Sequence, residues 1–326
     1  MSKVPALVAD IGGTHARFAW AQALDEAPRH AMTLKVADFA SPLAAVQRYL
    51  SELDRILGGE PARPRQAAVA VAAPLRGELI TFTNSHWSFS CDELQHELNL
   101  ERLLVLNDFE ALAYALPHLR SNQLRSWGET SVGPAGNLAV LGPGTGLGVA
   151  ALVKTASGWQ AMPGEGGHST LAPADDFESG LLSQVRKTFG HVSAERLLSG
   201  LGLPLLHQTI SQMKGQASPM VTTEGLVSAT LAGDPSASET LKHFCALLGG
   251  FAGNVALTFG AQGGLYIGGG IVPRLGDFFF ASQFRERFEA KGRYSAYLKD
   301  IPVTVITDSD AALLGAVHRL QSTPVT

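Results

Sequence analysis

Cysteine is scarce in this chain. Cys91 and Cys245 are the only two, and they lie far apart. The sequence therefore has neither a disulfide framework nor the closely spaced cysteines of a zinc site. It also lacks a basic stripe, and its net charge is −4, which argues against nucleic acid as a partner. The opening Met-Ser-Lys-Val-Pro has no apolar signal-peptide core, so we expect a cytoplasmic protein.

Long apolar runs are also missing, with one exception that needs an explanation. The segment from Phe244 to Gly260 is largely apolar, but it carries Asn254 and Thr258. It also contains Gly249 and Gly253, four residues apart, which permit close packing between helices. We expect a buried helix here and no membrane association.

Three common catalytic signatures are absent. The chain has no Gly-Lys pair, which a Walker A phosphate loop requires, and no G-x-S-x-G elbow of the α/β-hydrolases. The segment Gly144-x-Gly146 has Val149 where the Rossmann fingerprint needs its last glycine. A nicotinamide dehydrogenase is therefore disfavoured.

Glycine, in contrast, is abundant, and it gathers in clusters. The first cluster follows an apolar run that ends in an acid, Asp10, and precedes a second apolar run, which predicts a strand, a tight turn and a strand. Glycine permits positive φ and leaves backbone N–H groups uncovered, so such a turn can bind an anion. A carboxylate there suits a phosphate that carries Mg²⁺. The alternative is an ordinary Gly-Gly hairpin with a surface acid.

The same pattern occurs twice along the 326 residues, a length that suggests two domains. After the first hairpin, apolar spacing predicts a strand at 32–36, a helix at 42–57 and strands at 67–73, 79–83 and 103–106. A second hairpin then begins, with strands at 138–141 and 147–153 around Gly144-Thr145-Gly146. A third cluster, Gly268-Gly269-Gly270, follows another apolar strand. We expect two similar α/β lobes, of which only the first has an acid in its hairpin, since Leu141 is the counterpart of Asp10.

Polar candidates follow the strands. Asn107-Asp108 stands at the carboxyl end of the strand at 103–106, where α/β sheets place ligands, although both residue types are also preferred helix caps. The segment 163–168 flanks Glu165 with glycines and ends in His168, which indicates a loop that holds polar groups, a turn with exposed charges or a metal loop. Glu195 by itself is an exposed helical acid.

In this order the motifs resemble those of bacterial glucokinase, a member of the hexokinase–actin–Hsp70 superfamily. The similarity extends along nearly the whole chain and rests on the hairpin at Asp10, Thr83-Asn84-Ser85-His86-Trp87, Asn107-Asp108-Phe109, Gly144-Thr145-Gly146-Leu147-Gly148, Pro163-Gly164-Glu165-Gly166-Gly167-His168, His191-Val192-Ser193-Ala194-Glu195-Arg196 and Gly268-Gly269-Gly270-Ile271-Val272-Pro273-Arg274. It implies a two-lobed actin-like ATPase (ribonuclease H-like) α/β fold, each lobe a mixed sheet flanked by helices. The expected small domain is 1–108 plus about 305–326, the large domain is 109–304, and the active site lies in a cleft that closes on glucose.

The resemblance also implies a role for each matching position. Asp108 would be the general base that takes the proton from the sugar's primary hydroxyl group. The sugar would be bound by Asn84, Asn107, Asp108, Glu165, His168 and Glu195. The ATP phosphates would be held by Gly12, Gly13, Thr14, Gly144, Thr145 and Gly146, and the adenosine by Gly268, Gly269 and Gly270. Asp10 would hold Mg²⁺ through water.

The implied reaction is the ATP-dependent conversion of glucose to glucose 6-phosphate, the first step of glycolysis, by a cytoplasmic homodimer. One position departs from the family: His15 stands where asparagine is usual, so we expect activity with an altered ATP affinity. A second hypothesis is a sugar-responsive regulator or a chaperone-like ATPase on the same fold. The intact Asn107-Asp108 and Glu165 argue against it.

Overall fold

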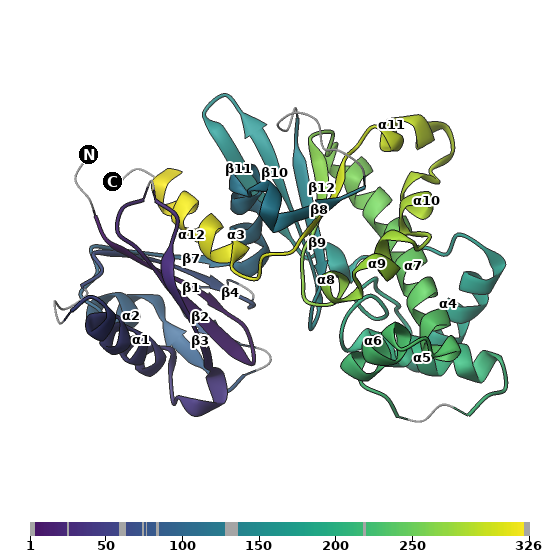
Figure 1. Cartoon of the computed structure of the whole chain (residues 1–326), viewed down its shortest axis with the longest axis horizontal. Helices are drawn as coiled ribbons and strands as arrows, with labels where there is room; N and C mark the ends of the chain where they lie inside the picture. The colour runs from purple at the N-terminus through teal and green to yellow at the C-terminus, as the bar shows by residue number, and fades with distance from the viewer. Residues whose placement is uncertain are drawn as a thin grey trace. The chain divides into compact units, whose positions relative to one another are not determined.

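A computed structural model describes residues 4–24, 26–58, 63–73, 75, 77–82, 85–127, 136–217 and 220–322 of the chain (Figure 1). Asn84, one of the predicted sugar ligands, lies outside these residues. The described residues fall into two compact units. Unit 1 takes its residues from Met1–Leu119 and Asp308–Thr326, and unit 2 from Arg120–Thr307.

Unit 1 is built on a five-stranded mixed sheet. Its strand order is β3 (Arg29–Lys35), β2 (His15–Ala21), β1 (Ala6–Ile11), β4 (Gln66–Val71) and β7 (Arg102–Asn107). The first three strands pair antiparallel, whereas β4 is parallel to both β1 and β7. A separate hairpin joins β5 (Leu79–Thr81) to β6 (Ser88–Ser90).

Helices cover both faces of this sheet, and the alternation along β1 shows why. Leu7, Ala9 and Ile11 share a core with residues of α1 (Pro42–Ile56) and α2 (Cys91–Glu97). Ala6 and Val8 instead share a core with α3 (Asp108–Ala115) and α12 (Ala311–Ser322). Successive side chains of a strand point to opposite faces, so Asp10 is on the α3–α12 face.

Local capping sets where the helices of unit 1 begin. Ser41 accepts a hydrogen bond at Oγ from the Ala44 N–H (3.2 Å), with Pro42 in the first turn of α1. Ser90 caps α2 in the same way through the Glu93 N–H (3.3 Å). Serine is a preferred N-cap residue and proline is favoured in the first turn, so short-range sequence signals set both helix starts.

Unit 2 is built on a six-stranded mixed sheet. Its strand order is β11 (Gly158–Gly164), β10 (Leu147–Thr155), β9 (Leu138–Pro143), β12 (Gly264–Ile267), β13 (Val303–Ile306) and β8 (Leu124–Ser126). The helices of this unit are α4 (Asp176–Phe189), α5 (Gly202–Met213), α6 (Thr223–Leu231), α7 (Pro235–Phe259), α8 (Val272–Leu275), α9 (Asp277–Phe280), α10 (Phe284–Glu289) and α11 (Ser295–Lys299).

The two sheets share one scheme. In each, three consecutive strands pair antiparallel, and two further strands then add in parallel beside the first: β4 and β7 beside β1, and β12 and β13 beside β9. The predicted pair of α/β lobes, each a mixed sheet with flanking helices, is confirmed.

The first boundary between the units differs from the predicted one, whereas the second lies close to the predicted position of about 305. Unit 1 runs to Leu119 rather than to Asp108 and resumes at Asp308. The reason is the contact between α3 and α12, which lie side by side in Figure 1. A Cβ added to Gly315 of α12 would lie 1.7 Å from the Ala111 carbonyl oxygen, so the two helix backbones nearly touch. Helix α3 therefore belongs with the C-terminal helix.

Helix α7 is the apolar segment that raised the question of a membrane span. Among the described residues, the structure has no helix that is both long and apolar enough to cross a membrane. Instead, α7 is packed in the core of unit 2, and its small residues face α10. A Cβ on Gly249 would lie 2.2 Å from the Phe284 carbonyl oxygen, and one on Gly253 would lie 2.6 Å from that of Phe288. The predicted buried helix with close packing at its glycines is confirmed.

Two histidines stack in unit 1. The rings of His118 and His318 have centroids 3.3 Å apart and planes inclined by 11°. Burial and the neighbouring His318 lower the pKa of His118 to about 4, and burial also lowers the pKa of His318. An unfolded histidine, with a pKa of about 6.5, binds a proton more readily than these folded ones. The stability that the pair contributes is therefore complete above about pH 6.5 and is lost as the pH falls toward 4.

We expect His118→Phe to weaken this acid sensitivity, because phenylalanine keeps the stacked ring but cannot gain a proton. Thermal unfolding at pH 8 and pH 5 should show a smaller difference in stability than in the wild type, by less than about 1 kcal/mol because His118 is only partly buried and solvent screens its charge. His96→Phe, at an exposed position of α2, is the control and should keep the wild-type pH dependence. Equal pH dependence of His118→Phe and wild type would contradict the assignment.

Candidate active site

Two predicted site residues of unit 1, Asp10 and Asp108, lie at the same end of its sheet. Asp10 pairs in register with Ala70 of β4, which pairs with Leu106 of β7, and Asp108 comes two residues later. With strands about 4.8 Å apart and a rise of about 3.3 Å per residue, the Cα atoms of Asp10 and Asp108 lie about 12 Å apart. Both residues stand at the carboxyl ends of parallel strands, where α/β sheets bind ligands.

Asp10 is held by an arginine. The two residues are directly paired across the β1–β2 hairpin, and Arg17 Nη1 donates a hydrogen bond to Asp10 Oδ2 over 3.1 Å. The Asp10 side chain is 16 % exposed. Burial raises the pKa of Asp10; Arg17 opposes this shift, and the Asp310 carboxylate adds to it. Arg17 is not among the site residues predicted from the sequence, although an acid and a base on facing strands of a tight hairpin would have indicated such a pair.

The chemistry of this edge fits a magnesium ion. Mg²⁺ is usually bound through one or two carboxylates, several waters and substrate phosphates rather than by a protein cage. Asp10 would supply one carboxylate, and Asp310, immediately before α12, lies close enough to influence it electrostatically. Asp308 Oδ1 accepts the Asp310 N–H over 2.9 Å and shapes this turn.

The hairpin turn itself is closed by a single backbone bond. The Gly12 N–H donates to the His15 carbonyl oxygen over 2.9 Å, while the His15 side chain is exposed. Gly12, Gly144 and Gly146 all have backbone conformations outside the left-handed region. The freedom of glycine to adopt a positive φ is therefore not used at these three residues. A Cβ on Gly144 would meet nothing within 4 Å, so this turn presents its backbone to open space.

Asn107 and Asp108 form the start of α3. Asn107 Oδ1 accepts hydrogen bonds from the N–H groups of Phe109 (2.9 Å) and Glu110 (3.3 Å), so the helix-cap interpretation is correct for this side chain. Asp108 Oδ1 also accepts the Phe109 N–H, over 2.9 Å. That bond orients the carboxylate at the positive end of the helix.

In unit 2 the structure brings together three predicted sugar ligands. His168 Nε2 lies 3.9 Å from Glu165 Oε2 and 3.8 Å from Glu195 Oε1. Glu165 immediately precedes a short 3₁₀ turn (Gly166–His168) that ends at His168, whereas Glu195 comes from the turns between α4 and α5. Glu195 is thus not in a helix, contrary to the expectation for this acid. Two of the three side chains are well exposed: His168 by 61 % and Glu165 by 72 %.

Glycines allow these segments to approach one another. A Cβ on Gly167 would lie 2.0 Å from the Leu147 carbonyl oxygen, and one on Gly166 would lie 3.0 Å from Val149 Cβ. The Glu195 N–H in turn donates to the Gly167 carbonyl oxygen over 2.8 Å. The loop at 163–168 is therefore fixed against β10, and it holds polar groups as one of its interpretations predicted. In the described ranges, no group of three or more His, Cys, Asp or Glu side chains is placed to hold a metal ion.

The third glycine cluster lies against the end of β9, the strand that immediately precedes the second cluster. The Gly268 N–H donates to the Leu141 carbonyl oxygen over 2.8 Å. Gly269 has a φ of +78°, and a Cβ there would lie 2.4 Å from the Pro143 carbonyl oxygen, so only glycine fits. Gly268-Gly269-Gly270 therefore packs at the end of β9, beside Gly144-Thr145-Gly146.

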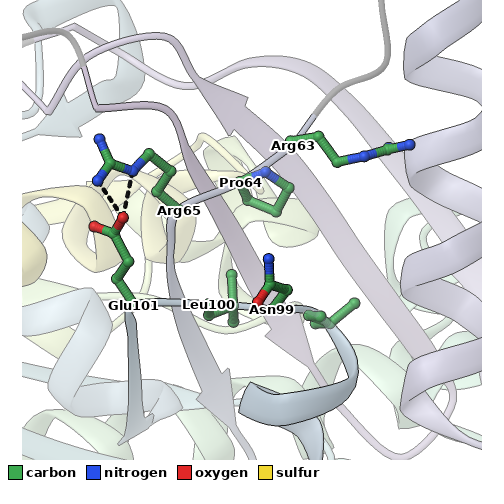
Figure 2. Close-up of a pocket in the computed structure, with 7 residues that line it drawn as sticks. Arg63, Pro64, Arg65, Asn99, Leu100 and Glu101 are labelled. Atoms are coloured by element: carbon green, nitrogen blue, oxygen red, sulfur yellow. Dashed lines mark hydrogen bonds and ion pairs between the residues drawn. The ribbon is translucent and has the colours of Figure 1, made fainter.

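A surface pocket elsewhere in unit 1 does not belong to this site. Figure 2 shows it between Arg63, Pro64 and Arg65 on one side and Asn99, Leu100 and Glu101 on the other, with Arg65 paired to Glu101. These residues immediately precede β4 and β7, so the pocket lies at the amino ends of the strands. Asp10, Asn107 and Asp108 are at the carboxyl ends.

Comparisons with known proteins agree on one family. The sequence profile described as Glucokinase matches residues 7–323. A glucokinase of Chromobacterium violaceum is 47 % identical over 324 residues, which cover 97 % of this chain and 89 % of that protein. A glucokinase of Aromatoleum aromaticum is 48 % identical over 320 residues, with 98 % and 95 % covered. The crystal structure of a glucokinase from an Antarctic psychrotroph is similar with a TM-score of 0.88, 38 % identity and coverage of 99 % of this chain and 100 % of that one.

Proposed function

The chain belongs to the glucokinase family, and we propose that it transfers the γ-phosphoryl group of ATP to the primary hydroxyl of glucose, giving glucose 6-phosphate and ADP. Family membership supports the phosphotransferase activity. The observation that supports the site is the convergence of Glu165, His168 and Glu195 beside the glycine turn of unit 2.

We propose that polar side chains from several loops bind the sugar. Carboxylates accept hydrogen bonds from hydroxyl groups, and imidazole can donate or accept. We assign Glu165, His168 and Glu195 to glucose hydroxyls, together with Asn84 and Asn107. The oxygen of Asn107 caps α3, so its NH₂ group is the part that would serve the sugar. Each buried partner that a wrong sugar leaves unpaired penalises that sugar, which is the basis of selectivity.

Proton removal falls to Asp108. A sugar hydroxyl is a weak nucleophile, and a carboxylate within hydrogen-bond reach assists as its proton leaves. The bond from the Phe109 N–H fixes the direction of the Asp108 carboxylate. Asp108 would receive the proton of the primary hydroxyl as the oxygen bonds to the γ-phosphorus.

We propose that backbone amides of the two hairpin turns bind the phosphates. The Gly12 and Gly144 N–H groups already bond within their turns, to the carbonyls of His15 and Gly146. We therefore assign the phosphate contacts to the turn residues that follow: Gly13, Thr14, Thr145 and Gly146. Gly268, Gly269 and Gly270 would border the adenosine. Mg²⁺ bound with ATP, with Asp10 as its protein ligand, would neutralise charge on the phosphates.

A phosphoryl-transfer screen tests the proposal. We expect ATP with Mg²⁺ to phosphorylate glucose faster than mannose or glucosamine, with one ADP formed per sugar phosphate. Chelation of Mg²⁺ should abolish turnover. Formation of ADP without a sugar phosphate, or binding of glucose without turnover, would favour the regulator or chaperone-like ATPase instead.

Assembly and location complete the proposal. We infer a cytoplasmic homodimer, which is what the resemblance to bacterial glucokinase implies. Sedimentation velocity across a range of protein concentrations measures the association state, and a monomer at all concentrations would reject the dimer without affecting the catalytic proposal.

A further inference from the structure

We propose that Glu195 couples glucose binding to ATP binding, because one carboxylate serves the sugar site and also anchors the phosphate-binding turn. This inference rests on the proposed function, which assigns Glu195 to glucose and Gly144-Thr145-Gly146 to the ATP phosphates. It adds a connection between two sets of residues that the sequence presents as separate motifs, about fifty positions apart.

The anchoring contact is a hydrogen bond to the backbone. Glu195 Oε2 accepts the Leu147 N–H over 2.8 Å, and Leu147 is the first residue of β10, directly after the turn. Gly146 makes room for this contact, since a Cβ at that position would lie 2.5 Å from Glu195 Oε2. A side chain at position 146 would displace the Glu195 carboxylate from Leu147, so the glycine serves this contact rather than the turn conformation.

The other oxygen of the same carboxylate faces the sugar ligands. Glu195 Oε1 lies 3.8 Å from His168 Nε2, and the Glu195 side chain is 31 % exposed, against 72 % for Glu165. Glu195 is therefore partly enclosed between the turn and His168, whereas Glu165 extends into solvent. A ligand hydroxyl that binds this carboxylate alters a group already bonded to the turn.

A second contact ties the same segment to the start of the turn. The Gly200 N–H donates to the Gly144 carbonyl oxygen over 2.7 Å, and a Cβ on Gly200 would lie 2.9 Å from that oxygen. The segment from Glu195 to Gly200 therefore holds the turn at both ends, through Leu147 and through Gly144. A shift of this segment on sugar binding has to be transmitted to the turn.

The coupling would arise because glucose and ATP both order the same turn. If glucose immobilises Glu195, the turn anchored to it loses freedom before ATP arrives, and ATP then meets a smaller entropic cost. Coupling between two ligands is reciprocal, so bound nucleotide must raise glucose affinity by the same factor. Typical factors are roughly 5 to 150.

Calorimetry with the non-hydrolysable analogue AMPPNP and Mg²⁺ measures this factor. For each variant, the ratio of the glucose Kd without nucleotide to that with nucleotide gives the coupling. We expect a ratio of about 5 or more for the wild type and about 1 for Glu195→Asp, whose shorter side chain cannot reach Leu147. Glu195→Gln, which keeps the length and an acceptor oxygen, should retain more of the coupling than Glu195→Asp.

Glu165→Gln is the matched control. It alters a second acid beside His168 that the structure does not bond to the turn, so glucose should bind more weakly while the ratio keeps its wild-type value. Weaker glucose binding alone therefore does not demonstrate coupling. Coupling through Glu195 is demonstrated if the ratio of glucose Kd values falls to about 1 in Glu195→Asp and keeps its wild-type value in Glu165→Gln.

Amide hydrogen exchange at Leu147, measured in the absence of glucose and nucleotide, reports on the hydrogen bond from the Leu147 N–H to Glu195 Oε2. We expect faster exchange at Leu147 in Glu195→Asp and the wild-type rate in Glu165→Gln. An unchanged Leu147 rate in Glu195→Asp, or a ratio of 1 in a wild type that does form glucose 6-phosphate, would overturn the coupling and leave the proposed function intact. If the wild type forms no glucose 6-phosphate and binds no glucose, the proposed function fails, and the coupling fails with it.

Discussion

Asp108→Asn is expected to lower kcat for glucose phosphorylation by about 10²- to 10⁴-fold, the usual contribution of a general base. Asparagine is close in size and also favours helix starts, so the fold and α3 should persist. It cannot accept the hydroxyl proton. A coupled assay for glucose 6-phosphate gives kcat, calorimetry gives the glucose Kd, and thermal unfolding checks the fold.

Glu110→Gln is the control for this variant. Glu110 lies in the same first turn of α3, with Oε1 4.0 Å from Arg319 Nε, so removal of its charge affects the helix terminus in a similar way. First-turn carboxylates stabilise a helix by about 0.3–1 kcal/mol. We expect the two variants to lose comparable stability and only Asp108→Asn to lose turnover. Near wild-type kcat in Asp108→Asn would reject Asp108 as the base.

Gly249→Ala should destabilise unit 2 by about 3 kcal/mol, near the upper end of the usual cost of overpacking a core. The added methyl group would collide with the Phe284 carbonyl oxygen of α10, 2.2 Å away, and backbone cannot be displaced as cheaply as a flexible side chain. Urea denaturation measures the free energy of unfolding, and glucose phosphorylation by the remaining folded protein should be unaffected.

The adjacent residue supplies the matched control. A Cβ on Gly250 would meet nothing within 4 Å, although it lies in the same helix α7. Gly250→Ala should therefore be neutral or stabilise by about 0.4–1 kcal/mol, because alanine lowers the entropy of the unfolded chain. Equal effects of the two substitutions would show that helix propensity, rather than the contact with α10, governs this position.

Much of the fold could be predicted from local signals. The apolar runs at 7–11 and 138–141 are strands, Ser41 and Ser90 cap helices, and the repeated hairpin indicated two related lobes. These features depend on residues close in sequence, whose hydrogen bonds and side-chain periodicity are encoded locally. The strand β11 was missed, because its residues alternate weakly and the strand is largely exposed.

Some residues of the candidate site could likewise be located from local sequence, and others could not. Asp10 and Asn107-Asp108 could be located because each ends an apolar strand, a position that the sequence makes visible. Arg17 was missed because its significance lies in its pairing with Asp10 across the hairpin. Glu195 was misplaced in a helix because nothing adjacent to it in sequence shows that its backbone bonds to Gly167.

The sequence by itself indicated the family, through the resemblance of its ordered motifs to those of known proteins, and it predicted many of the strands and helices, whose spacing and short-range hydrogen bonding are local. Only the tertiary structure decided which residues meet. Gly146 and Glu195 are far apart along the chain, yet the Glu195 carboxylate occupies the space in which a side chain at position 146 would lie. Such contacts depend on how distant segments cross one another, and packing over the whole unit fixes that crossing.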